Sequence, residues 1–154
     1  MTTVHVHLVL NHIPPVLLLT ALVFLVVGVA RSSESSFVTG LRITIAAGFI
    51  AIPVAGSGLV SASVLHDAGW LDLDGVSRHQ WIGIFAASLT IVLAVVSGVV
   101  LYRRRAMSQR VKAGVLALAL TALAVMSWAA TVGGSLRHTE LQSKNVQDRT
   151  TLDR

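Results

Sequence analysis

The stretch HQWIGIFAASLTIVLAVVSGVVLYRRR, residues 79–105, decides the fold class of this chain. It contains no charged residue between His79 and Arg103, and a helix needs about 20 apolar residues to cross the hydrocarbon core of a bilayer. The three arginines that follow are typical of the cytoplasmic end of a membrane span. Residues 79–101 are therefore predicted to form a transmembrane helix.

Three further apolar runs are similar to this one in length and composition. Together the four runs predict transmembrane helices at about 8–30, 43–65, 79–101 and 113–133. Only 12% of the 154 residues are charged and 54% are hydrophobic, whereas about a quarter of a soluble domain is charged. The sequence predicts an all-α integral membrane four-helix bundle over residues 1–138, followed by a polar tail, 139–154.

Three prolines predict local features of the first two spans. Pro14 and Pro15 fit the first turn of a helix, where a missing N–H has no partner. The regular helix is then expected to begin near Asn11 or His12, with Asn11 as a candidate N-cap and residues 2–10 as a separate interfacial turn. Pro53 predicts a kink in the second span.

Basic residues are distributed unequally between the two sides of the membrane. The loops after the first and third spans hold seven basic residues and the single acid Glu34, whereas the opposite side holds five basic residues and six acids. Because cytoplasmic loops are enriched in Lys and Arg, both termini are predicted to be extracytoplasmic in a bacterial inner membrane. The basic pI of about 11.1 follows from these flanks, so nucleic acid is not an expected partner.

The chain contains no cysteine. This excludes disulfides, iron–sulfur clusters held by thiolates, and haem attached through a C-x-x-C-H motif. Any cofactor is therefore held without a covalent link to sulfur.

All six histidines fall on the predicted extracytoplasmic side, at the outer ends of four different spans. They are His5, His7, His12, His66, His79 and His138. Histidine also favours membrane interfaces, as tryptophan does, and His5 is expected to be only interfacial. Ionisable groups near the membrane are costly and commonly functional, and helix bundles build cofactor sites from side chains on neighbouring helices.

The neighbours of these histidines indicate the kind of cofactor. One turn inward from His66, His79 and His138 stand the small residues Ala62, Gly83 and Gly134. Small residues would let a flat porphyrin lie close to the helices that ligate it. Arg78 and Arg137 directly precede histidines, and arginine pairs with carboxylates such as haem propionates, although an interfacial arginine also snorkels towards headgroups.

Three motifs give the sequence a family resemblance over residues 5–141. They are Leu10-Asn11-His12-x-Pro14, Arg78-His79 and Gly133-Gly134-Ser135-Leu136-Arg137-His138-Thr139-Glu140. Together they resemble a family of small four-helix bacterial membrane proteins of unknown function, with an L-N-H-x-P start and a G-G-x-x-R-H-x-E end. Ser57-Gly58 replaces a T-G pair of that family, Gln80 a frequent glutamate and Thr139 a proline. The resemblance implies a b-type cytochrome, and the lost acids argue against a carboxylate-bridged metal site.

The sequence thus predicts a membrane b-type cytochrome that holds one or two haem b groups near the extracytoplasmic surface. The preferred ligands are His12, His66, His79 and His138, with His7 in reserve. Ligation by two histidines fills both axial positions of the iron and favours electron transfer. The expected partners are membrane lipid, a quinol of the outer leaflet, and an extracytoplasmic cytochrome or a larger redox complex.

Two other functions stay open at this stage. Histidine also suits non-haem copper, zinc or iron, and the chain would alternatively be a structural or assembly subunit without a cofactor. No nucleophile–base pair, carboxylate pair within a span or phosphate loop is present in the sequence. We therefore expect an electron-transfer subunit rather than an enzyme acting alone.

Overall fold

The computed structural model describes residues 2–67, 73–103 and 107–152, and these residues are almost entirely helical. The helices are α1 (Thr2–Leu10), α2 (Ile13–Ala30), α3 (Glu34–Asp67), α4 (Leu73–Tyr102) and α5 (Gln109–Leu152). Within the described ranges there is no β-strand. The predicted all-α fold class is confirmed.

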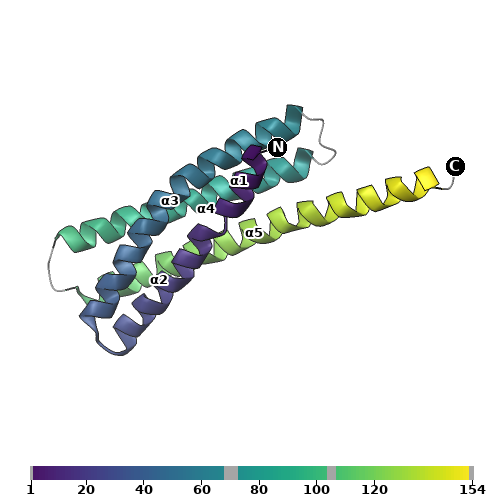
Figure 1. The fold of residues 1–154 in the computed structure, drawn as a ribbon. Coiled ribbons are helices and arrows are strands. Elements are labelled where there is room, and N and C mark those ends of the chain that lie inside the picture. Colours follow the sequence, from purple (N-terminus) through teal and green to yellow (C-terminus); the bar gives the residue numbers. More distant parts are fainter. Residues whose placement is uncertain (1, 68–72, 104–106, 153–154) are drawn as a thin grey trace.

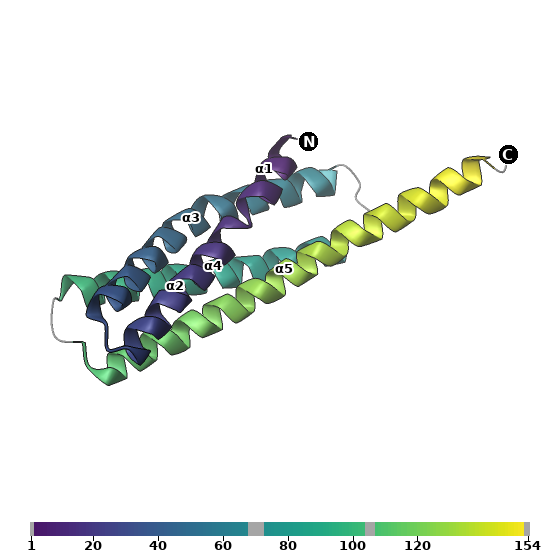
Figure 2. The same cartoon turned by 60° about the horizontal axis from the view of Figure 1, so that its bottom comes forward.

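Four segments are long and apolar enough to cross a membrane: Val4–Ala30, Glu34–Val64, Leu73–Tyr102 and Gln109–Ser135. The first of them includes most of α1 together with α2, and each predicted span overlaps one of the four. The prediction of a multi-pass, four-helix membrane protein is therefore confirmed. Helix α5 continues beyond its apolar part through the predicted polar tail, and it extends past the other helices (Figure 2).

The helices form an antiparallel bundle in which consecutive helices are neighbours (Figure 1). Helix α2 packs against α3 and α5, α3 against α4, α4 against α5, and the short α1 against α3. The start of α1, the end of α3 and the start of α4 lie at one end of the bundle, which we call the outer end. The turn between α2 and α3 lies at the opposite, inner end together with the end of α4 and the start of α5.

Helices α1 and α2 are separated by a break at Asn11 and His12. His12 occupies the N-cap position of α2 without a side-chain cap hydrogen bond, so the Asn11 side chain is not the cap. The prolines lie in the first turn of α2, as predicted. The segment before the break is the helix α1, where the sequence analysis expected only a turn.

Helix α3 contains Pro53 and remains helical on both sides of it. Proline has no N–H to donate to the carbonyl four residues earlier, here that of Phe49, and its ring crowds that carbonyl. In both ribbon views α3 changes direction part-way along its length (Figures 1 and 2), which agrees with the predicted kink.

The inner half of the bundle has a well-packed core that includes Leu18, Leu25, Phe37, Leu41 and Leu93. Close approach of helices depends there on glycine, because a Cβ on Gly28 would lie 2.6 Å from the backbone nitrogen of Phe37. A buried hydrogen bond of 2.7 Å between Thr44 Oγ1 and Ser97 Oγ also joins α3 to α4. In lipid the hydrophobic effect does not drive helices together. Close van der Waals packing, which small residues allow, and interhelical hydrogen bonds hold them together instead.

The outer half has a smaller core, a cluster formed around Ile82, Ala86 and Ala129 of α4 and α5. Two of these three residues are alanines, so fewer large side chains fill the space between the helices. The polar side chains discussed below lie at this outer end.

The contact between Gly48 and Ala94 tests the importance of close packing between α3 and α4. A Cβ added at Gly48 would overlap that of Ala94, so Gly48→Ala should lower the free energy of unfolding by about 1–3 kcal/mol. Denaturant titration in detergent micelles measures this change. Gly98→Ala is the matched control, because no atom lies within 4 Å of its added Cβ and alanine is the better helix former. Equal destabilisation by both variants would contradict the packing argument.

Candidate functional site

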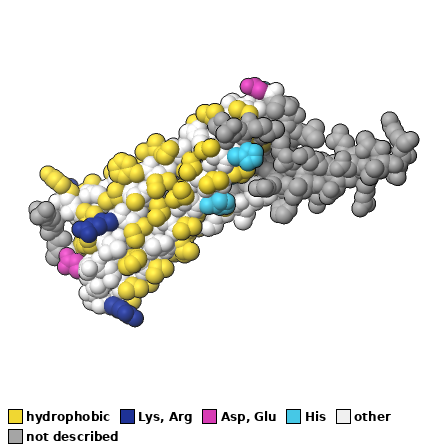
Figure 3. Space-filling view, in the orientation of Figure 1, with side chains coloured by type: hydrophobic (Ala, Val, Ile, Leu, Met, Phe, Trp, Pro, Cys, Tyr) yellow, Lys and Arg dark blue, Asp and Glu magenta, His cyan; other side chains and the backbone are white. Residues whose placement is uncertain are grey.

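Histidine and the basic side chains lie at different ends of the bundle. In the face shown in Figure 3, the visible histidines lie towards the outer end, and the visible Lys and Arg side chains lie towards the inner end. This separation agrees with the placement expected from the sequence. The histidines differ greatly, however, in burial and in hydrogen bonding.

His7 of α1 is half-buried against α3. Its Nδ1 lies 3.0 Å from Ser57 Oγ, and the Ser57 hydroxyl is 2.8 Å from the carbonyl oxygen of Val54. A carbonyl only accepts, so when the Ser57 hydroxyl donates its one proton to Val54 it accepts from His7. In this arrangement the neutral His7 ring carries its proton on Nδ1 and has a free lone pair on Nε2.

His79 of α4 is half-buried against α5 and has the same arrangement. Its Nδ1 lies 3.1 Å from the backbone carbonyl oxygen of Ala129, which can only accept a hydrogen bond. The proton of the neutral ring is therefore on Nδ1, and Nε2 has the free lone pair. In metal sites a ligating histidine almost always donates its other N–H in this way, which fixes the tautomer and the ring orientation.

Each of the two rings lies on a glycine of the neighbouring helix. A Cβ on Gly58 of α3 would lie 3.0 Å from Cε1 of His7, and one on Gly133 of α5 would lie 2.7 Å from Cε1 of His79. A side chain at either position would displace the ring. Glycine therefore provides the space that each imidazole occupies between two helices.

His7 and His79 both lie towards the outer end of the bundle, near the starts of α1 and α4. Their sequence positions are far apart, and their rings are held by two different neighbours, α3 and α5. The outer end of the bundle thus presents two imidazoles whose Nδ1 atoms are bonded and whose Nε2 atoms are available. We call this arrangement the histidine pair.

Among the side chains that the structure describes, the other predicted ligands are not held in this way. His12 is exposed at the break between α1 and α2, and the His66 side chain is 73% exposed with Nδ1 3.7 Å from Asp67 Oδ1. Arg78 is exposed at the start of α4. His138 and Arg137 lie on the helical backbone of α5, and their side chains are outside the described residues.

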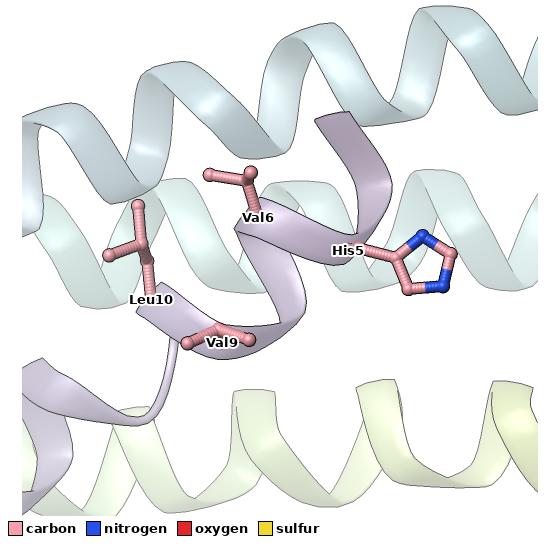
Figure 4. Close-up of a pocket in the computed structure, with 4 residues that line it drawn as sticks. All are labelled: His5, Val6, Val9 and Leu10. Atoms are coloured by element: carbon pink, nitrogen blue, oxygen red, sulfur yellow. The ribbon is translucent and has the colours of Figure 1, made fainter. Parts of the chain in front are cut away.

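His5 belongs to a shallow apolar hollow rather than to the histidine pair. The hollow is lined by His5, Val6, Val9 and Leu10 (Figure 4). All four residues come from α1, and the His5 ring projects away from the Leu10 side chain. This hollow lies on one helix only, so it does not explain the convergence of several helices at the outer end.

The small residues predicted to lie one turn from His66, His79 and His138 have different surroundings in the structure. Gly83 shares the face of α4 that carries the buried Ala86, Ala87 and Thr90, yet no atom lies within 4 Å of where its Cβ would be. The inward face of α4 is therefore open one turn from His79. Gly134 is exposed with open space around it, and Ala62 is half-buried.

Asn11, which the sequence suggested as a cap and as part of the L-N-H-x-P motif, is a further polar residue near His7 in the chain. Its side-chain Oδ1 is buried and has no hydrogen-bond partner. The backbone N–H of Asn11 donates to the carbonyl oxygen of His7 over 2.9 Å. Residues four apart share a helix face, so the amide lies on the same side of α1 as the His7 ring.

Ser57, Gly58 and Gly133 are site residues that the sequence analysis did not select. Ser57-Gly58 stood out only as the pair that replaces T-G of the resembled family, and Gly133 only as part of the terminal motif. Among the described residues, no group of three or more His, Cys, Asp and Glu could hold a metal ion. Within the described residues, the imidazoles that are hydrogen-bonded to a neighbouring helix are those of the histidine pair.

No family model matches this sequence, and no curated protein or solved structure is detectably similar to it.

Removing the Ser57 hydroxyl tests whether it holds His7 and, through it, α1. Ser57→Ala removes the hydroxyl that lies 3.0 Å from His7 Nδ1, so the docking of α1 on α3 should weaken by about 1 kcal/mol. Faster amide hydrogen exchange in residues 4–10 would report this change. Ser63→Ala is the matched control, since the exposed Ser63 hydroxyl donates only to its own helix, at Val60. The same exchange rates in both variants would refute this role of Ser57.

Proposed function

We propose that this chain is a membrane b-type cytochrome that holds haem b non-covalently between His7 and His79 and transfers electrons. The observation that carries the proposal is the shared hydrogen bonding of the histidine pair: both Nδ1–H groups are bonded to protein acceptors, and both Nε2 lone pairs remain available. Imidazole nitrogens are the axial ligands of b-type haem. His138 stays a predicted ligand from the sequence alone.

The number of ligands favours haem over a bare metal ion. Zinc in proteins takes three or four ligands from side chains, and the described residues offer no such group. Haem needs only two axial ligands, because the porphyrin supplies the other four nitrogens. The bound haem would supply one-electron chemistry at its iron, and the protein would position it and exclude water.

The open inward face of α4 also supports a flat cofactor. Gly83 lies on the buried face of α4 and has no packing partner within 4 Å of its missing Cβ. Gly83 is partly exposed, so a flat molecule that lies against this part of α4 would meet no side chain there. A macrocycle placed against Gly83 would fill this open space.

The proposed membrane is the bacterial inner membrane, with the outer end of the bundle on the extracytoplasmic side. The support is the charge asymmetry: Arg31, Arg42, Arg103, Arg110 and Lys112 belong to the turns and helix ends of the inner end. The histidine pair is then near the extracytoplasmic surface. Since it lies at one level, the chain alone would not carry electrons across the bilayer, and it would exchange them with a quinol or an extracytoplasmic redox partner.

Cysteine labelling tests this orientation, because the natural chain has no cysteine. Ser35 at the start of α3 and Asp74 at the start of α4 are both exposed and lie at opposite ends of the bundle. A membrane-impermeant maleimide should label Asp74→Cys on intact cells and label Ser35→Cys only after lysis. The reverse pattern would contradict the proposed orientation.

Haem content tests the function directly. The purified protein should show a Soret band and a positive pyridine haemochrome assay, and His7→Ala or His79→Ala should remove most of the bound haem because either variant lacks one axial ligand. His12→Ala and His66→Ala should keep it, since both rings are exposed. A colourless wild-type protein that contains stoichiometric copper, zinc or iron would favour a non-haem centre. A protein with neither would favour a structural subunit.

A further inference from the structure

A lysine ammonium lies over the end of the hydrophobic core at the inner end of the bundle. Lys112, in the first turn of α5, places its Nζ 5.6 Å from the centre of the Phe37 ring of α3, a distance typical of a cation–π contact. The Phe37 side chain is fully buried, and Lys112 is only partly exposed. An ordinary interfacial lysine extends its ammonium into water, whereas the ring contact fixes the charge of Lys112 against the bundle.

The inner end of α2 adjoins this contact. A Cβ on Gly28 of α2 would lie 2.6 Å from the backbone nitrogen of Phe37, and α2 also packs against α5. Arg31, three residues after Gly28, follows the last residue of α2, and its side chain is exposed. Lys112 and Arg31 therefore belong to the inner ends of two helices that pack together, and we call these two cations, with the Phe37 ring, the inner cationic site.

The protein does not balance the charge at its inner end. Each of the four spans has a basic residue there, and the described ones are Arg31, Arg42, Arg103, Arg110 and Lys112. Glu34 is the one acid among the described residues of this end, and within the described ranges none of these cations forms an ion pair with a carboxylate. The contact with Phe37 leaves the positive charge of Lys112 in place, so an anion from outside the chain is expected to balance it.

The surroundings of the inner cationic site indicate that this anion belongs to a lipid. Arg31 directly follows the apolar part of α2, and Lys112 directly precedes that of α5, so both cations lie at the boundary of the hydrocarbon core, next to the headgroup region. Two turns before Arg31, the apolar side chains of Val23 and Phe24 are 54% and 38% exposed. A phospholipid offers a phosphate to the cations and acyl chains to these side chains, whereas a free anion offers only the charge.

We propose that Lys112 and Arg31 bind the phosphate of an anionic phospholipid in the leaflet at the inner end of the bundle. The ammonium and the guanidinium both donate hydrogen bonds to phosphate oxygens. The headgroup is expected to be anionic, because a zwitterionic headgroup brings its own cation and leaves the positive charge of the inner end unbalanced. The site lies at the opposite end of the bundle from the histidine pair, so the proposal does not depend on haem.

Native mass spectrometry tests the proposal on purified protein mixed with equal amounts of dioleoylphosphatidylglycerol and dioleoylphosphatidylcholine, which have the same acyl chains. Wild type should retain the anionic lipid roughly fivefold more than the zwitterionic one, the preference that one basic side chain provides at an anionic lipid surface. Lys112→Gln should lose most of this preference, and Lys112→Arg should keep it because the cation remains. Arg78→Gln is the matched control, since it removes an exposed cation from the outer end.

The proposal is overturned if wild type retains the two lipids equally, a comparison that requires no variant. It is also overturned if Lys112→Gln keeps the preference. Equal loss of the preference in Arg78→Gln would refute it too, because net charge rather than the inner cationic site would then attract the lipid. Displacement of the anionic lipid by an excess of inorganic phosphate would indicate a site for a free anion and would likewise refute the lipid site.

Discussion

The site depends on one interaction made twice: the donation of a histidine Nδ1–H to an acceptor on a neighbouring helix. For His79 the acceptor is a backbone carbonyl of α5, and for His7 it is a serine hydroxyl whose own proton is bonded to the α3 backbone. Each bond fixes the tautomer and the direction of the ring. His12 and His66, for which the structure shows no hydrogen bond to a neighbouring helix, are exposed.

The scaffold that makes these bonds is a bundle whose packing differs between its two ends. The inner end has large core side chains, close glycine contacts and the buried Thr44–Ser97 hydrogen bond. The outer end has alanines, glycines under the two rings and open space at Gly83. A well-packed inner half that supports a less densely filled outer half would suit the proposed haem, because His7 and His79 are positioned before it binds.

The break between α1 and α2 has a functional consequence in this arrangement. It lets α1 pack against α3 and places His7 on Ser57 and Gly58. It also leaves the Asn11 oxygen buried without a partner beside the same face. A polar group retained in such surroundings at a cost in stability is commonly functional, since stability alone would favour an apolar residue.

The sequence by itself determined the four spans, the all-α class and the placement of histidines in the parts of the chain that form the outer end. Apolar length and the absence of charge decide these properties locally, as residues 79–105 show. It also indicated the prolines at the start of α2, but it predicted a turn where α1 is a helix. Only the tertiary structure decided which histidines are held: His7, a reserve ligand in the sequence prediction, is hydrogen-bonded to a neighbouring helix as His79 is, whereas His12 and His66 are exposed. The reason is that ring orientation depends on acceptors and glycines of neighbouring helices, at Ser57, Gly58, Ala129 and Gly133, and spacing along one helix carries no information about them.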